Sequence, residues 1–456
     1  MKPGKLLMLL VATGHIGCSA IQHDAWQQET VAFIGKRVGT EVSMVNSADE
    51  SRIVGERVRA LLSEPLDAHS ALTIAMLNNR SVQALLAEVG IARAELLAAS
   101  AYANPKLDAD LRFESGGILN VEAALIQSVL DLLFVPLRRS VAEEAYQGEK
   151  ARLTAAVIGV ATDVRKAFID YVAAVQSEEV RVQAVAAAEL SAELSRRLHA
   201  AGNVSDLQHF TERAQSERSR LALAGAREAV IIARERLNDL MGLWGEDVSW
   251  HSEGRLPDPS GDSPTVSEVE RCAVARSLQL ASLQHALEAA SQRAGFASWE
   301  AVTGEVHVGG TYSHEESTDK YGPAFSIPIP LFNWGQADKT RALAELRRLE
   351  HEYYALAVRV RAEARVAWSR LQSAERRTQQ SRKVIIPLHR QVTAETQKHY
   401  NAMLLGAFDL FRAKQEEIES GIDYIEALRD YWTARAQLDG LLAGVVGDLE
   451  QRKEAH

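Results

Sequence analysis

The chain has 456 residues, which at about 150 residues per domain corresponds to three domains or to one long one. Apolar residues make up 46% and charged residues 25%, so wholesale disorder is excluded, while the aromatic content of 6% and the many alanines favour helices. A net charge of −10 argues against a nucleic-acid-binding surface, and the two cysteines define no disulfide framework.

The first residues have the pattern of an export signal. Two lysines precede a short apolar run, so residues 1–17 are expected to be removed as a signal peptide. Gly17-Cys18 resembles the lipobox of bacterial lipoproteins, which implies a lipid anchor on Cys18. An ordinary signal peptide that contains a chance cysteine is the alternative. Residues 18–66 then form an N-terminal periplasmic segment, and no later apolar run is long enough for a transmembrane helix.

The rest of the chain contains two copies of one plan, separated by about 195 to 200 residues. We place the first repeat at 67–242 and the second at 265–446. The stretch 243–264, rich in Gly, Pro, Ser and Asp, is the linker between them, and 447–456 is a C-terminal tail. The matching segments are Arg80–Gln83 with Arg276–Gln279, Val135–Leu137 with Ile329–Leu331, and Gly202 and Asp206 with Gly406 and Asp409.

Each copy predicts a helix, two strands, a long helix and a medium helix. In the first copy the opening helix covers Asp67–Ala103, and an alternating strand follows at Leu107–Glu114. A second strand runs over Val121–Phe134 and is ended by Pro136. Leu137–Ala200 contains no proline and carries apolar residues at helical spacing, which predicts one helix about 96 Å long. Such a rod is far longer than the helices of a globular domain.

The second copy repeats this order. Its strands are predicted at Ala301–Tyr312 and Tyr321–Phe332, around a charged loop at His314–Lys320. Strands of about ten residues fit a tilted bilayer crossing, but a half-buried soluble sheet would show the same alternation. The export signal and the long helices favour the membrane. Four strands cannot close a barrel alone, whereas three chains would supply twelve. The side chains then expected to face lipid are Leu111, Phe113, Ile327 and Ile329.

Two segments and the duplicated order together resemble the TolC-like outer-membrane efflux proteins. The segments are Pro330-Leu331-Phe332-Asn333-Trp334-Gly335-Gln336 and the stretch from Ala71-Leu72 to Asn78-Asn79. The resemblance implies a mainly α-helical protein with a membrane β-barrel: a homotrimer with twelve strands in outer-membrane lipid and a long α-helical periplasmic barrel. It also implies a passive exit duct of a tripartite efflux system, without enzymatic activity or cofactor, that meets an inner-membrane pump through a periplasmic adaptor protein.

The resemblance also assigns roles to the two turns that follow the long helices. By the resemblance, Gly202 and Gly406 lie at the tip that contacts the adaptor. Glycines that merely end a helix would show the same sequence pattern. Asp409 matches the first acidic residue of a periplasmic gate, while Arg412 stands where the second would be. A ring of Asp409 residues, a pair between Asp409 and Arg412 of neighbouring chains, and a simple helix cap at Asp409 all remain open.

Catalytic and metal-binding patterns are missing from the sequence. His351-Glu352 begins a zinc-protease motif, but Ala355 stands at the position of its second histidine. His199 and His209 have no cysteine or carboxylate cluster at ligand spacing, so we predict no metal site. Two other classes of protein stay in view: a periplasmic adaptor, which would need further domains around one helical hairpin, and a helical scaffold, which would not need the four strands.

Overall fold

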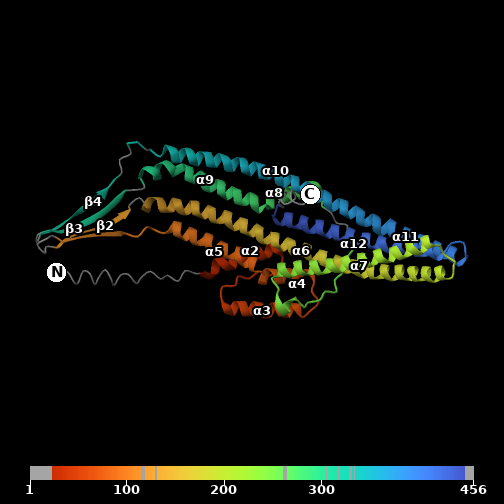
Figure 1. The fold of residues 1–456 in the computed structure, drawn as a ribbon. Coiled ribbons are helices and arrows are strands. Elements are labelled where there is room, and N and C mark those ends of the chain that lie inside the picture. The colour runs from red at the N-terminus through yellow and green to blue at the C-terminus, as the bar shows by residue number, and fades with distance from the viewer. Residues whose placement is uncertain are drawn as a thin grey trace.

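The computed structural model describes residues 23–113, 119–128, 131–259, 264–303, 306–315, 318–327, 331–332 and 334–446. The expected signal peptide, Cys18, Ile329 and the C-terminal tail lie outside these residues. The molecule is elongated, with the strands at one end, two helical turns at the other, and a thicker middle where short helices lie beside the long ones (Figure 1).

The longest helix, α6 (Asp131–Ala200), spans 70 residues and forms the spine of the molecule. Toward the strands it packs between α5 (Arg80–Ser100) and α9 (Leu278–Thr303), and α10 (Gln336–Gln380) flanks α9. Toward the other end it packs between α7 (Asp206–Met241) and α12 (Ala407–Ala443), which α10 and α11 (Ile386–Asn401) flank. The helices therefore form one continuous layer (Figure 1).

The four strands form one antiparallel sheet in the order β1-β2-β3-β4. Its central pair joins the two copies, because β2 belongs to the first repeat and β3 to the second. The outer strands β1 and β4 have no partner on their free sides within the described chain. The strand bounds are β1 Lys106–Phe113, β2 Leu119–Ser128, β3 His307–Glu315 and β4 Thr318–Ser326.

The two copies share a broken first helix. The single helix expected over residues 67–103 is wrong: α4 (Ala68–Asn78) ends, and α5 begins after Asn79. The Asn79 carboxamide oxygen accepts a hydrogen bond from Ser81 N at 2.7 Å, and its Nδ2 donates to Leu240 O at 2.7 Å. In the second copy Ser277 separates α8 (Val266–Arg276) from α9, and its hydroxyl accepts from Leu280 N at 3.2 Å. Ser277 thus corresponds to Asn79 in the structure. The sequence match pairs Ser277 with Ser81 instead, which lies two positions further along the chain.

Several predicted boundaries between strand and helix are also wrong. The strand expected at Val121–Phe134 ends at Ser128, because α6 already begins at Asp131. Pro136 lies in the second turn of this helix, where it removes one hydrogen bond without ending the helix. In the second copy α9 extends through Thr303 into the start of the predicted strand. Short apolar runs fit the period of a strand as well as that of a helix, so the sequence pattern alone could not place these boundaries.

The charged loop predicted at His314–Lys320 is instead the end of the β3-β4 hairpin. Its charged and polar side chains pair across the two strands: Asp319 accepts from the Tyr312 hydroxyl at 2.9 Å and lies 2.8 Å from Nδ1 of His314. The strand predicted to reach Phe332 ends at Ser326. Mutual pairing of polar side chains explains why a charged segment stays extended here.

A short π-helix at Ser381–Ile385 joins α10 to α11. Pro387 follows in the first turn of α11 and cannot donate a backbone hydrogen bond to the preceding turn. The wider π-helical turn accommodates the missing hydrogen-bond donor of Pro387, so the helix continues beyond it. No described helix combines the length and the apolar character that a membrane crossing requires.

The N-terminal segment packs as two helices, α2 (His23–Val38) and α3 (Ala48–Leu62), against the middle of the layer. Ile34 and Val38 of this segment are fully or almost fully buried. The guanidinium of Arg37 donates to Ala443 O at 3.1 Å, at the end of α12. The segment therefore connects the first repeat with the last helix of the second.

We expect Asn79→Ala to lower the free energy of unfolding by about 1 to 2 kcal/mol, because α5 loses its N-cap and Leu240 O loses a donor. Denaturant unfolding followed by circular dichroism measures this. Asn203→Ala is the matched control, since Asn203 is exposed in a turn. Equal destabilisation by both changes would contradict the capping role.

Candidate functional site

The first helical turn, between α6 and α7, is closed by backbone hydrogen bonds and one left-handed residue. Asn203 N donates to Leu198 O at 2.9 Å, and Gly202 N donates to His199 O at 2.9 Å. Gly202 has φ +71°, a conformation that costs a residue with a side chain about 1 to 2 kcal/mol. Ser205 then caps α7 by accepting from Gln208 N at 3.3 Å.

The second turn, between α11 and α12, repeats these bonds with different residues. Leu404 N donates to His399 O and Met403 N to Tyr400 O, each at 2.9 Å. The left-handed residue is Met403, with φ +57°, and it is the one described non-glycine residue with positive φ. Gly406 has φ −82° and precedes α12 at its N-cap, so the suggestion that it ends the preceding helix is wrong.

These positions correct the correspondence between the two copies. By backbone geometry Gly202 matches Met403, and Ser205 matches Gly406. Asp206 opens α7, whereas Asp409 is the third residue of α12, so the two aspartates are not equivalent. The sequence match pairs Gly202 with Gly406, whereas the backbone pairs Gly202 with Met403.

The two turns differ in surface chemistry. At the first, His199 Nε2 lies 2.6 Å from Asp206 Oδ1, and the His199 and His209 rings stack at 4.8 Å. Nearby, hydrogen bonds from Arg196 and Arg197 lower the pKa of Glu193 to about 2. At the second, Met403 and Leu404 are 92% and 69% exposed. The first turn therefore presents polar groups beside the exposed Leu207, whereas the second presents Met403 and Leu404.

Asp409 and Arg412, predicted as gate residues, lie beside each other at the start of α12. Asp409 Oδ2 accepts from Gly406 N at 3.1 Å, which is a cap contact. Arg412 approaches Asp409 Oδ1 at 4.0 Å within the same chain, and both side chains are partly exposed. The cap contact leaves a carboxylate oxygen accessible, so Asp409 has the geometry for a second role.

Within the described residues no group of three or more histidine, cysteine, aspartate or glutamate side chains has the arrangement of a metal site. His199 and His209 lie together, but their rings are stacked at an interplanar angle of 17°, which turns their nitrogens away from a common point. The contact between the two rings is therefore one of packing.

The sheet has one apolar and one polar face. Cross-strand partners Leu107 with Leu125 and Leu111 with Val121 lie on the first face, and this series continues to Tyr312 with Tyr321. Leu111, Phe113 and Phe325 are 57%, 78% and 67% exposed. The opposite face carries Asp108, Asp110, Arg112, Glu122, Thr311, Ser313 and Lys320. No described element covers the apolar face.

The helical layer also has two unlike faces. On α6, Gln176 accepts from Leu256 N at 3.3 Å and Glu179 pairs with Arg255 at 2.7 Å, so the linker covers that side. Helix positions two residues apart point about 200° away from each other. Ala174 and Ser177, which lie two positions away, line a groove on the opposite, open side.

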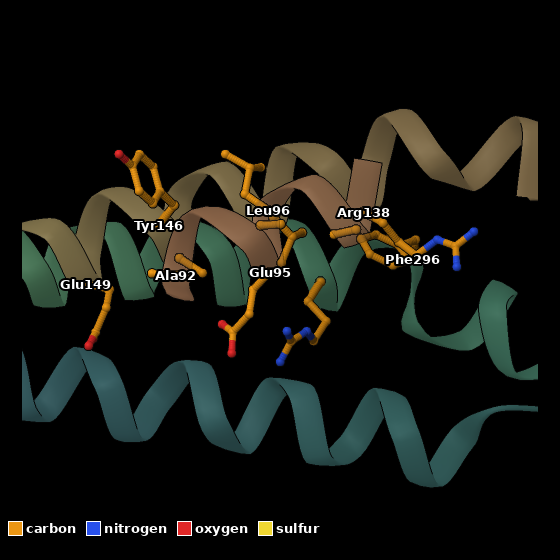
Figure 2. A pocket seen from close by; sticks show the side chains of 12 residues that line it. Ala92, Glu95, Leu96, Arg138, Tyr146, Glu149 and Phe296 are labelled. Atoms are coloured by element: carbon orange, nitrogen blue, oxygen red, sulfur yellow. The ribbon is translucent and has the colours of Figure 1, made fainter. Parts of the chain in front are cut away.

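A second groove lies on the same open side nearer the strands, between α5, α6 and α9. It has a volume of about 540 Å³ and continues across α9 toward α10. Figure 2 shows Glu95 and Glu149 extending from α5 and α6 toward α10, with Tyr146 and Phe296 in the groove wall. The open face is thus grooved along both halves of the layer.

Sequence reasoning missed three features of these surfaces. Ser205 and Met403 shape the turns, and a serine before a helix was the available signal for the first. A methionine in left-handed conformation leaves no such signal. The grooves need the lateral order of the helices, which the sequence does not contain.

The fold is similar to that of solved outer-membrane channels. The chain aligns with the Campylobacter jejuni CmeC outer membrane channel with a TM-score of 0.69 and 13% identity, covering 91% of this chain and 92% of that one. It aligns with the Vibrio cholerae outer membrane protein VceC with a TM-score of 0.67 and 14% identity, covering 86% and 97%. The resemblance to TolC-like channels is thereby confirmed at the level of the fold.

Among curated proteins, the chain is 22% identical to the cobalt-zinc-cadmium resistance protein CzcC of Cupriavidus metallidurans over 396 residues. The alignment covers 83% of this chain and 90% of that protein. No family model matches the chain.

The two turns offer a matched pair of substitutions. Met403→Gly should raise the free energy of unfolding by about 1 kcal/mol, because glycine adopts positive φ without the steric cost. Gly202→Ala should lower it by about the same amount, although the added Cβ would meet no atom within 4 Å. Denaturant titrations of both variants measure the shifts. Shifts of the same sign would show that backbone strain does not decide the stability of these turns.

Proposed function

We propose that this protein is the outer-membrane exit duct of a tripartite efflux system and that it works as a homotrimer. The observation that carries the proposal is the sheet with a bare apolar face and two free edges, placed at one end of a long helical layer. The similarity in fold to outer-membrane channels along most of the chain supports it.

Ring closure follows from the sheet. An unpaired strand edge is not tolerated in lipid, so β1 and β4 each need a partner. In a four-stranded meander the first and last strands run in opposite directions. β4 of one chain can therefore pair antiparallel with β1 of the next, and three chains close a barrel of twelve strands with its apolar face outward.

The flanks of the helical layer support the same closure. One flank consists of α5 and α7, where Ile91 and Leu221 are 62% and 75% exposed. The other consists of α10 and α11, where Val358 and Leu388 are 66% and 53% exposed. Joining unlike flanks around a threefold axis would bury these side chains and build a closed helical barrel.

The turns remote from the strands are the surface proposed for contact with a periplasmic adaptor and, through it, an inner-membrane pump. Gly202 shapes one turn and Gly406 begins the helix after the other. We retain a lipid anchor at Cys18, the repeats at 67–242 and 265–446, and the linker 243–264 as parts of this proposal.

The two alternative classes receive no support. A periplasmic adaptor would carry further domains around one hairpin, whereas the described chain has two helical hairpins and one shared sheet. A helical scaffold would leave the exposed apolar face of the sheet without a purpose.

Membrane fractionation and the migration of unheated protein on gels test the proposal. We expect a trimer in the outer-membrane fraction. Leu111→Arg should reduce it, because a charge on the apolar face costs about 2 to 4 kcal/mol near the bilayer midplane. Ser313→Arg, on the polar face of the same sheet, is the control and should assemble normally. Normal assembly of Leu111→Arg would mean that this face does not meet lipid.

Asp409→Ala tests the proposed gate. If three aspartates surround the closed end, the variant should lose cation selectivity and block by multivalent cations in planar-bilayer recordings. Loss of the cap contact alone should lower the free energy of unfolding by about 1 kcal/mol and leave selectivity unchanged. A variant with unchanged selectivity and block therefore assigns Asp409 to capping.

A further inference from the structure

Among the described residues that line four grooves of the helical layer, arginine is the one basic residue type. In the half nearer the strands, the two connected grooves carry three arginines and three glutamates. Arg293 of α9 lines both grooves and forms no ion pair with another described residue. The six charged residues are Arg138, Arg293, Arg348, Glu95, Glu149 and Glu345.

The groove in the other half, between α6, α7 and α12, has a volume of about 640 Å³ and carries more positive than negative charge. Its charged residues are Arg181, Arg236, Arg429, Asp170 and Glu426, on a floor made largely of alanine. Arg236 is exposed and forms no ion pair with the described residues. Burial raises the pKa of Asp170, an effect that Arg429 and Arg236 oppose.

The open face therefore differs from the chain as a whole. The net charge of the protein is −10, yet its grooves carry as many arginines as acidic residues or more. A groove between α10 and α12 carries two arginines and three acidic residues, of which Glu426 also lines the groove between α6, α7 and α12.

We propose that the open face is a path for anionic solutes, in which arginines of successive grooves meet carboxylate, sulfonate or phosphate groups on their way out. The inference rests on the proposed function, because this face lines a tunnel only in the closed trimer. A guanidinium stays charged at every physiological pH and donates paired hydrogen bonds to such groups. In a confined passage its field also raises the local concentration of anions.

The test is the reversal potential of the purified trimer in planar bilayers under a KCl gradient. The wild-type channel should pass measurable chloride even where Asp409 at the closed end favours potassium. Arg236→Gln and Arg293→Gln should each reduce the ratio of chloride to potassium permeability by about twofold or more, since each removes one charge per chain from the tunnel. Arg255→Gln is the control, because Arg255 lies on the covered face and pairs with Glu179.

The possible outcomes distinguish the proposed anion path from the proposed function as an exit duct. A protein that forms no trimer in the outer-membrane fraction contradicts the proposed function itself. A conducting trimer that excludes chloride, or whose permeability ratio is the same in Arg236→Gln, Arg293→Gln and Arg255→Gln, overturns the anion path and leaves the duct intact. Circular dichroism of each variant confirms that the comparison is made between folded proteins.

Discussion

Close packing along both sides of α6 is the interaction on which the rest of the structure depends. Glycines mark its tightest points: a Cβ on Gly148 would lie 3.2 Å from Ser282 O of α9, and one on Gly440 of α12 would meet the Thr162 side chain of α6. Because one helix of 70 residues contacts elements of both repeats, it joins the two copies along its length, although their buried side chains form separate clusters. The N-terminal segment adds a further link through Arg37.

The duplicated plan is preserved in backbone geometry more than in sequence. Asn79 and Ser277 break the first helix of each copy with the same kind of cap, although their neighbours align two positions apart. Both helical turns use the same hydrogen bonds, with glycine at one left-handed position and Met403 at the other. The turns thereby keep one backbone shape and carry different side chains.

The helical layer has one covered face and one open face, so the two faces can serve different purposes. The N-terminal segment and the linker occupy one side of α6, which leaves grooves with balanced charge on the other. The sheet has a matching division, with apolar side chains on one face and charged ones on its reverse. A closed ring of such chains places polar surfaces inside along the whole length, because only the outer face of the sheet suits lipid.

The sequence by itself determined the duplication, the long helix, the alternation of the strands and the position of the turns. These features depend on local periodicity and on glycine and proline, which act within a few residues. Only the tertiary structure decided where α6 begins, that Asn79 interrupts a helix, and that Met403 rather than Gly406 takes the left-handed position. Each of these depends on contacts distant in sequence or on backbone geometry, as when Asn79 binds Leu240 O of the following hairpin. The open face and its arginines likewise exist only once α6, α7, α9 and α12 lie side by side.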